Sequence, residues 1–413
     1  MSNKLKIKDV CSIIPGFAFK SNDFWSWNNI AIKIKDIHPP YINYKEADVV
    51  CVKPKDENLQ LRKWDFVMAM TGATIWKVWY LPDDVDNVFI NQRVCKFVEK
   101  EWYDHKYLYY ILTQNSFQNF IISNVDSSSA QPNISHYTIW NYEHIFPDLS
   151  VQKKISKVLS SIDDKIELNN KINLELEAMA KELYEYRFVQ FDFPDENGKP
   201  YKSSGWKMVW NEELKREIPE GWSVEMIKDT FGSVWGYSFS SDDYVENWKY
   251  KLYTIGNVQD GYIVSEVDNY LDYLPDNMPE ECLLKPWEML MSLTWNVGRV
   301  WFVYENNALL NQRVLKLQSE EWHKAFMYMT FIQDSMKLTL ERISNWTSQK
   351  NLSPINMWKL KMVVPPEEVL KKYDSMCNPM IDKMVNNFSE NLKLSELRDF
   401  LLPMLMNGQV IVK

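Results

Sequence analysis

Residues 151–188 read VQKKISKVLSSIDDKIELNNKINLELEAMAKELYEYRF, a stretch without proline or glycine. Apolar side chains recur on one face at heptad spacing: Ile155, Ile162, Leu176 and Leu183, supported by Leu159, Ile166 and Met179. Such a seam is typical of a two-helix coiled coil, and its polar exception, Asn169, is the kind of residue that fixes register at a cost in stability. The stretch therefore predicts a helix of roughly 57 Å that separates two globular parts.

A second stretch repeats this pattern. Val158–Tyr184 aligns without gaps with Met376–Leu402, and the seam residue Asn169 then falls on Asn387. Two such helices in one chain can each supply the apolar face that the other needs, which predicts an intramolecular pair. The alternative is two separate helices that each dock on their own domain.

Motifs outside these helices also occur twice, which indicates one globular unit written twice. The matching stretches are Gly16–Phe24 with Gly236–Tyr244, Ile34–Ile37 with Ile255–Val258, Asn91–Val94 with the identical Asn311–Val314, and Ser129–Ser135 with Thr347–Ser353. We expect a first unit at 1–150, a helix at 151–190, a linker at 191–217, a second unit at 218–366 and a helix at 367–413. Each unit is expected to mix short strands with a helix; the expected segments are strands Ile30–Ile37, Phe66–Met70, Lys77–Tyr80 and Val88–Phe97, and helices His105–Ile122 and Trp322–Ile343.

Composition sets the broad class. The 413 residues are 46% hydrophobic and 25% charged, as in ordinary globular proteins. No apolar run is long enough for a membrane span, the N-terminus lacks a signal-peptide pattern, and the five cysteines form no CxxC pair. These features predict a cytoplasmic protein without a structural zinc site or disulfide framework. The net charge of −9 gives no general indication of nucleic acid, so any DNA contacts must be local or shared with partners.

Catalytic signatures are weak. There is no GxxxxGK[ST] phosphate loop. His38-Pro39-Pro40-Tyr41 resembles the tetrad of amino-methyltransferases, but His38 lacks the carbonyl acceptor that its first position needs. Pro82-Asp83-Asp84 and Asp195-Glu196 with Lys199 weakly resemble a metal nuclease, and acidic loops are the simpler interpretation. We therefore predict no catalytic residue and no metal site.

Polar loops that recur in both units are the better candidates. Their hydroxyl, amide and cationic groups suit phosphate contacts and base edges, although ordinary turn chemistry explains many of them equally well. Asn91-Gln92-Arg93 is identical in both copies, which favours a structural or phosphate-clamping role, because residues that read different half-sites should differ. The candidate DNA-binding residues are Lys20, Ser21, Lys35, Thr71, Lys77, Arg93, Ser129 and Gln131 in the first unit, and Ser240, Ser241, Thr294, Asn296, Arg299, Arg313, Ser348, Gln349 and Lys350 in the second.

Tryptophan is abundant and glycine scarce. The chain has 18 Trp and 11 Gly, whereas average usage predicts roughly 29 Gly. Between the repeats the two exchange places, since Gly72 matches Trp295 and Trp76 matches Gly298. We hypothesise that many of these tryptophans are UGA codons that the source reads as glycine; a naturally Trp-rich protein is the alternative. The suspected positions are Trp25, Trp27, Trp64, Trp76, Trp79, Trp140, Trp206, Trp235, Trp248, Trp287, Trp295, Trp301, Trp346 and Trp358, whereas Trp102, Trp210, Trp222 and Trp322 are expected to be genuine.

These motifs together resemble a type I restriction–modification specificity (S) subunit over nearly the whole chain. The resemblance rests on the paired Gly-(Phe/Tyr)-(Ala/Ser)-Phe motif, the Thr-Gly turn, Asn-Gln-Arg-Val, Ser-Gln-Lys-Asn-Leu-Ser, Ile218–Trp222 and Leu401–Leu405. It implies an α+β fold: two similar mixed α/β target recognition domains joined by two long antiparallel coiled-coil helices in a pseudo-twofold repeat.

The resemblance also implies the partners. Each domain would read one half of a split double-stranded DNA site, and the helices would set the gap and dock two methyltransferase (M) subunits. Restriction (R) subunits would join for cleavage, and S-adenosylmethionine, ATP and Mg would be bound by those partners and not by this chain. The alternative is an enzyme in its own right, a stand-alone nuclease or methyltransferase; a cytoskeletal coiled-coil protein is disfavoured by the two large mixed units.

Overall fold

The computed structural model describes residues 3–25, 28–38, 41–72, 75–125, 132–195, 197–246, 249–319, 323–346 and 350–412. The chain divides into two compact units, the first formed by Met1–Glu167 with Lys393–Lys413 and the second by Leu168–Leu392. Each unit thus contains part of both long helices, so the helices are not separate bodies. The linker expected at 191–217 belongs to the second unit. Within the described ranges, no helix has the length and apolar character needed to traverse a bilayer.

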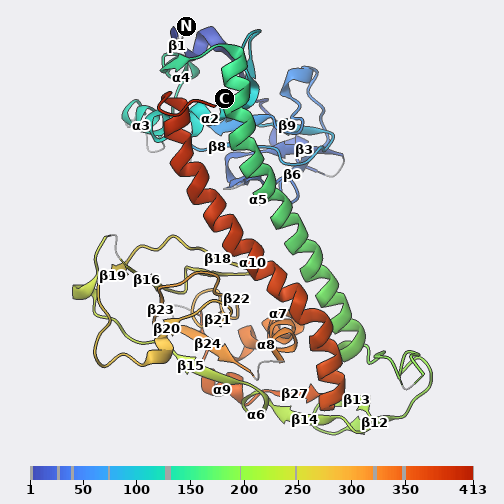
Figure 1. Ribbon diagram of the computed structural model, residues 1–413. Helices are drawn as coiled ribbons and strands as arrows, with labels where there is room; N and C mark the ends of the chain where they lie inside the picture. The colour runs from blue at the N-terminus through green and yellow to red at the C-terminus, as the bar shows by residue number, and fades with distance from the viewer. Residues whose placement is uncertain are drawn as a thin grey trace. The chain divides into compact units, whose positions relative to one another are not determined.

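The first unit is built on two small sheets (Figure 1). A four-stranded antiparallel sheet has the order β2 (Cys11–Pro15), β10 (Val94–Glu99), β7 (Phe66–Ala69) and β8 (Val78–Tyr80). A three-stranded sheet has the order β6 (Asp48–Val50), β3 (Asn29–Ile32) and β9 (Val88–Ile90), with β3 and β9 parallel. The remaining elements are the pairs β1 (Asn3–Lys6) with β11 (Glu143–Phe146) and β4 (Ile37–His38) with β5 (Tyr41–Ile42), and the helices α1 (Ile7–Val10), α2 (His105–Thr113), α3 (Asn115–Ser123) and α4 (His136–Trp140).

The second unit repeats this topology, with one added strand, β20, in its smaller sheet. Its sheets have the orders β15 (Gly232–Trp235), β24 (Val314–Gln318), β21 (Met289–Ser292), β22 (Val300–Phe302), and β19 (Tyr270–Leu271), β16 (Tyr250–Tyr253), β23 (Ala308–Leu310), β20 (Leu283–Leu284). β16 and β23 are parallel, as β3 and β9 are. The other counterparts are β14 (Ser223–Met226) with β27 (Lys361–Val364), β17 (Val258–Gln259) with β18 (Tyr262–Ile263), and the helices α6 (Ile227–Thr230), α7 (Lys324–Ile332), α8 (Asp334–Ile343) and α9 (Pro354–Trp358). The pair β25 (Asn345–Trp346) with β26 (Lys350–Asn351) has no matching strand pair in the described part of the first unit. A hairpin of β12 (Met208–Asn211) and β13 (Arg216–Pro219) lies between the copies. The predicted duplication is therefore confirmed.

Several expected segments are broken where a polar residue intervenes. The helix expected at 105–122 is two helices, because Gln114 between them is extended, with φ −68° and ψ 148°. Gln333, with φ −60° and ψ 136°, divides α7 from α8 in the same way. The strand expected at 88–97 is divided by the turn of Asn91–Arg93 into β9 and β10. The single-helix and single-strand expectations were wrong at these points.

The two long helices, α5 (Leu149–Tyr184) and α10 (Glu367–Met406), pair side by side and run antiparallel (Figure 1). In the second unit Asn169 donates to Asn391 at 2.9 Å, whereas Asn387 donates to Asn173 at 2.7 Å. In the first unit Arg398 reaches Asp163 at 2.9 Å. Partner numbers fall as α5 numbers rise, which confirms the antiparallel coiled-coil pair.

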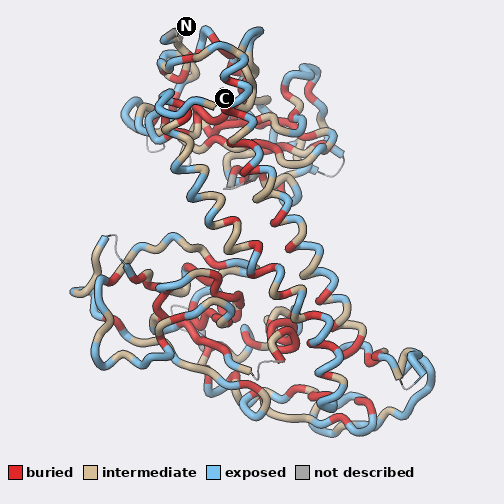
Figure 2. Tube along the Cα trace, viewed as in Figure 1, coloured by how far each residue is buried: buried red, intermediate tan, exposed pale blue. Residues whose placement is uncertain are grey.

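The helix seam is buried much as expected, with one exception. Ile155, Leu159 and Ile162 are buried, and Asn169 is fully buried (Figure 2). Met179 was expected on this face, but its side chain is 50% exposed. The heptad position of Leu159 and Ile166 continues to Asn173 and Ala180, which are both buried, so Met179 lies one residue off the interface.

Candidate nucleic-acid interface

In the first unit, four loops meet at one end of the β2-β10-β7-β8 sheet. Phe17 bridges to Asn91, and Thr71 bridges to Asn133. The amide of Met70 donates to the carbonyl of Arg93 at 2.9 Å, and the amide of Gly72 donates to that of Pro132 at 3.0 Å. We call residues 16–24, 70–72, 91–94 and 132–135 the first loop cluster.

The second unit builds the same arrangement. Tyr237 bridges to Asn311, and Thr294 bridges to Asn351. The amide of Leu293 donates to the carbonyl of Arg313 at 3.0 Å, and the amide of Trp295 donates to that of Lys350 at 3.0 Å. Residues 236–244, 293–296, 311–314 and 350–353 form the second loop cluster. The motifs that recur in the sequence are thus the residues that assemble these two clusters.

The identical Asn-Gln-Arg-Val turns form the frame of each cluster. The amide of Gln92 donates to Phe17, and the amide of Gln312 donates to Tyr237, both at 2.9 Å. A Cβ on Gly16 would collide with the carbonyl oxygen of Asn91, and one on Gly236 with that of Asn311. Only glycine allows this backbone approach. This geometry gives the motif a structural role, which was one of the two roles expected for it.

Several candidate side chains already have partners within the chain. Lys35 binds Asp48 at 2.8 Å, and hydrogen bonds from Lys33 and Lys35 hold the pKa of Asp48 below its usual range. Arg299 donates to Gln259 and lies 4.0 Å from Asp260. Lys350 lies 3.2 Å from Glu341. These pairings fit the interpretation of ordinary turn chemistry, because a DNA phosphate would have to displace a carboxylate or an amide at each.

Other candidate DNA-binding residues belong to the two loop clusters or adjoin them. Lys20 and Ser240 each precede a short 3₁₀ turn, Ser21–Asp23 and Ser241–Asp243, and both side chains are exposed. The Thr294 hydroxyl donates to Asn351 at 3.3 Å. Lys77, Asn296, Arg93 and Arg313 belong to the same turns or adjoin them. Ser129, Gln131, Ser348 and Gln349 lie outside the described residues.

Two residue pairs that the sequence search did not single out hold the sheet behind each cluster. Lys96 binds Asp65 at 2.6 Å, and Lys316 binds Glu288 at 2.8 Å, with both lysines buried. Each lysine also donates to a backbone carbonyl, that of Gln60 or of Glu281. Lys96 and Lys316 follow Asn-Gln-Arg-Val at the same spacing in the two copies, and this repetition is the sequence signal that could have identified the pairs. A buried lysine paired in this way is structural and would be costly to leave alone.

The acidic motifs behave as loop residues. Asp83 accepts from the Tyr44 hydroxyl at 2.8 Å. Asp195 accepts from the amides of Asn197 and Lys199, as turn carboxylates commonly do. Within the described ranges, no three His, Cys, Asp or Glu side chains gather as metal ligands. Pro39 and Pro40 of the proline tetrad lie outside the described residues.

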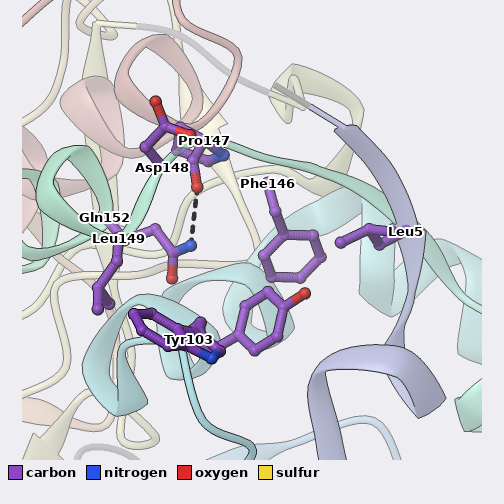
Figure 3. A pocket seen from close by; sticks show the side chains of 8 residues that line it. Leu5, Tyr103, Phe146, Pro147, Asp148, Leu149 and Gln152 are labelled. Carbon is purple, nitrogen blue, oxygen red and sulfur yellow. Dashed lines mark hydrogen bonds between the residues drawn. The ribbon is translucent and has the colours of Figure 1, made fainter. Parts of the chain in front are cut away.

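A pocket in the first unit lies apart from the loop cluster, next to the start of α5 (Figure 3). The rings of Tyr103 and Phe146 and the side chain of Leu5 line it, together with Gln152. The Gln152 amide is committed on both sides, since it donates to Pro147 at 2.8 Å and accepts from the amide of Asp104 at 3.0 Å. The pocket lies where the start of α5 packs against the rest of the first unit, and none of the predicted DNA-binding residues lines it.

Comparison with known proteins finds similar sequences along nearly the whole chain. Residues 2–178 match the family model described as the type I restriction modification DNA specificity domain. The chain is 25% identical to the type I restriction enzyme MjaIX specificity subunit of Methanocaldococcus jannaschii, over 99% of this chain and 93% of the relative. It is 21% identical to the HindI specificity subunit of Haemophilus influenzae, over 94% and 96%. The chain is thus similar, over nearly its whole length, to type I restriction enzyme specificity subunits.

A solved structure shares the fold of this chain. The S subunit of a type I restriction–modification system from M. genitalium is 16% identical, with a TM-score of 0.57. The match covers 98% of this chain and 96% of that one. Both globular units and both long helices therefore fall within the shared fold.

Proposed function

We propose that each unit of this specificity subunit reads one half of a bipartite double-stranded DNA site through its loop cluster. One observation carries this proposal. The same four loops are assembled twice on the same backbone frame, whereas the side chains presented on the frame differ between the copies. Ser21 is matched by Ser241, but Lys20 is matched by Ser240 and Asn22 by Asp242. A constant frame with variable side chains suits two readers of different sequences.

The antiparallel helices would set the distance between the two half-sites. Methyltransferase and restriction subunits would supply S-adenosylmethionine, ATP and Mg²⁺ chemistry, and this chain would remain non-catalytic. The acidic net charge of −9 fits this division of labour, because partners would then supply much of the phosphate contact. The MjaIX and HindI relatives are named as subunits of restriction enzymes, which supports such an assembly.

The test is to map the DNA modified by the complex. The chain is produced with the methyltransferase subunit of its own system, and methylated positions are mapped across a plasmid library. We expect a split motif with a fixed gap. The matched variants are Lys20→Ala in the first loop cluster and Lys8→Ala, an exposed lysine on α1 outside it. A contiguous motif, or modification by the chain without the methyltransferase subunit, would contradict the proposal.

A further inference from the structure

Four tryptophans adopt a backbone conformation that suits glycine. The φ angles are +71° at Trp64, +79° at Trp102, +78° at Trp287 and +65° at Trp295. A side chain in this region costs free energy because its Cβ crowds the following carbonyl, and a bulky residue there is an outlier. Asn28, Asn87, Asn307, Phe191, Lys215 and Arg313 also have positive φ. Asparagine tolerates the conformation, and tryptophan has no comparable local hydrogen bond. Positive φ therefore marks a glycine position here only where the turn or the other repeat also calls for glycine.

Three of these positions occupy the same place in a tight turn. The amide of Asp65 donates to Arg62, that of Tyr103 to Lys100 and that of Glu288 to Lys285. Each bond closes a four-residue turn whose third residue is tryptophan. Positive φ at the third residue is the requirement that selects glycine in a type II turn, and proline is favoured just before it. Pro286 stands at that place before Trp287.

The fourth position has a glycine counterpart in the other unit. Gly72 has φ +84° and donates to Pro132, whereas Trp295 has φ +65° and donates to Lys350. Pro132 and Lys350 are themselves equivalent, because each lies one residue before the asparagine that bridges to Thr71 or Thr294. The two turns are the same turn, written once with glycine and once with tryptophan. The Trp295 side chain is 58% exposed.

Buried tryptophans point in the same direction. Trp79 in β8 and Trp301 in β22 are equivalent, and neither indole N–H has an acceptor within the part of the chain that the structure describes. A buried N–H normally finds a partner. Trp222 packs against Phe188, Phe191 and Phe193 with centroids 6.0, 5.4 and 5.0 Å away. Glycine at position 222 would leave that core empty. Trp301 packs against Phe302, Tyr328 and Phe388 in the same way, so what sets Trp301 apart is its buried indole N–H without an acceptor among the described residues.

We infer that Trp64, Trp102, Trp287 and Trp295 are glycine in the natural protein, encoded by UGA codons that the source cell reads as glycine. This adds Trp102, which the sequence alone assigned as a genuine tryptophan. The inference does not rest on the proposed function. It carries a consequence for where the subunit can work, since Trp25 is the first tryptophan in the chain. If its codon is also UGA, a cell that reads UGA as stop ends the chain after Phe24.

The test reads the gene and the natural protein together. The four codons are sequenced, and the protein purified from its source cells is digested and its peptides are sequenced by mass spectrometry. We expect TGA at all four codons, glycine in the peptides, and TGG with tryptophan at Trp222. TGG at the four positions overturns the inference, and so does TGA with tryptophan in the peptides. Glycine at position 222 would overturn the sorting of positions by backbone conformation.

Discussion

The buried asparagines between α5 and α10 give a prediction that can be worked through in numbers. Asn387 is fully buried, and its side-chain amide donates to the Asn173 oxygen at 2.7 Å. Asn387→Ala removes this donor and leaves a buried oxygen without it, at a cost of about 1–3 kcal/mol. The Asn387 oxygen has no partner among the described residues, so its removal offsets part of that cost. We therefore expect a loss of about 2 kcal/mol.

Replacing both partners should behave differently. Asn173→Ala leaves the buried Asn387 amide without its acceptor. It should lower the free energy of unfolding at least as much as Asn387→Ala does. The double replacement Asn173→Leu with Asn387→Leu removes both polar groups and extends the apolar seam, which is near neutral or stabilising in comparable cases. The double variant should therefore be at least about 2 kcal/mol more stable than the sum of the single alanine losses predicts. It should also hold the helix register less firmly.

Hydrogen exchange of the full chain, followed by mass spectrometry on peptides from 168–180 and 380–392, measures this locally. A loss of about 2 kcal/mol accelerates exchange through local opening about 30-fold. Asn386→Ala is the matched control, because Asn386 is the preceding residue and is exposed. Equal exchange in the Asn386 and Asn387 variants, or additive losses in the double variant, would refute the reasoning.

Four further perturbations test other parts of the structure. Burial raises the pKa of Asp374 to about 7 from an ordinary 3.8, although its Oδ1 accepts from the Phe326 amide at 2.9 Å. The stabilising contribution of Asp374 should therefore be complete below pH 3.8 and lost as pH rises through about 7. Asp374→Asn should flatten the dependence of the free energy of unfolding on pH in this range. Arg398→Ala leaves the buried Asp163 carboxylate with the Tyr110 hydroxyl, 2.5 Å away, as its side-chain partner among the described residues. The free energy of unfolding, measured in urea, should fall by about 3 kcal/mol. No loss would mean that the carboxylate is solvated. Gly236→Ala should destabilise the protein by more than about 2 kcal/mol, because its Cβ would collide with the Asn311 carbonyl. Gly256→Ala is the control and should be nearly neutral, because its Cβ would meet only Thr254, at 3.6 Å. Similar melting temperatures for the two variants would contradict this. Lys20→Ala should weaken DNA binding by the complex and lower the slope of log affinity against log salt by about 0.9, with Lys8→Ala unchanged, and equal slopes would remove Lys20 from the interface.

Repetition in the sequence predicted the fold because each repeated motif has one structural task. Gly16 and Gly236 admit a neighbouring backbone, and Asn-Gln-Arg-Val closes the turn against it. Asn169 and Asn387 occupy equivalent positions of the repeat because both lie in the helix interface. Placing an apolar residue opposite either asparagine would require a different register of the two helices. Duplication supplies a second observation of every position, so chance matches are rare.

The errors arose where local geometry is decided by contacts that the pattern does not contain. Gln114 and Gln333 each follow a helical run of buried side chains, and their extended backbone turns the next helix onto the core. Met179 is a different case, because it lies one residue before the heptad position that the buried Ala180 occupies, so the spacing itself places it outside the interface. Trp102 has a tryptophan counterpart in Trp322, so comparing the repeats gave no warning, and only its φ angle did.

The candidate DNA contacts were predicted less completely than the fold. The recurring loops do meet at one end of each sheet, because their backbones are held by Asn-Gln-Arg-Val. Which side chains remain available depends on partners distant in sequence, such as Asp48 for Lys35 and Gln259 for Arg299. A single sequence carries no signal for those pairings.

The central claim is that two copies of one unit read two separate half-sites. It is tested most directly by exchanging residues 218–366 for those of a relative and mapping the methylated motif of the resulting complex. One half of the motif should change while the other half and the gap stay the same. A change in both halves, or in neither, would contradict the account.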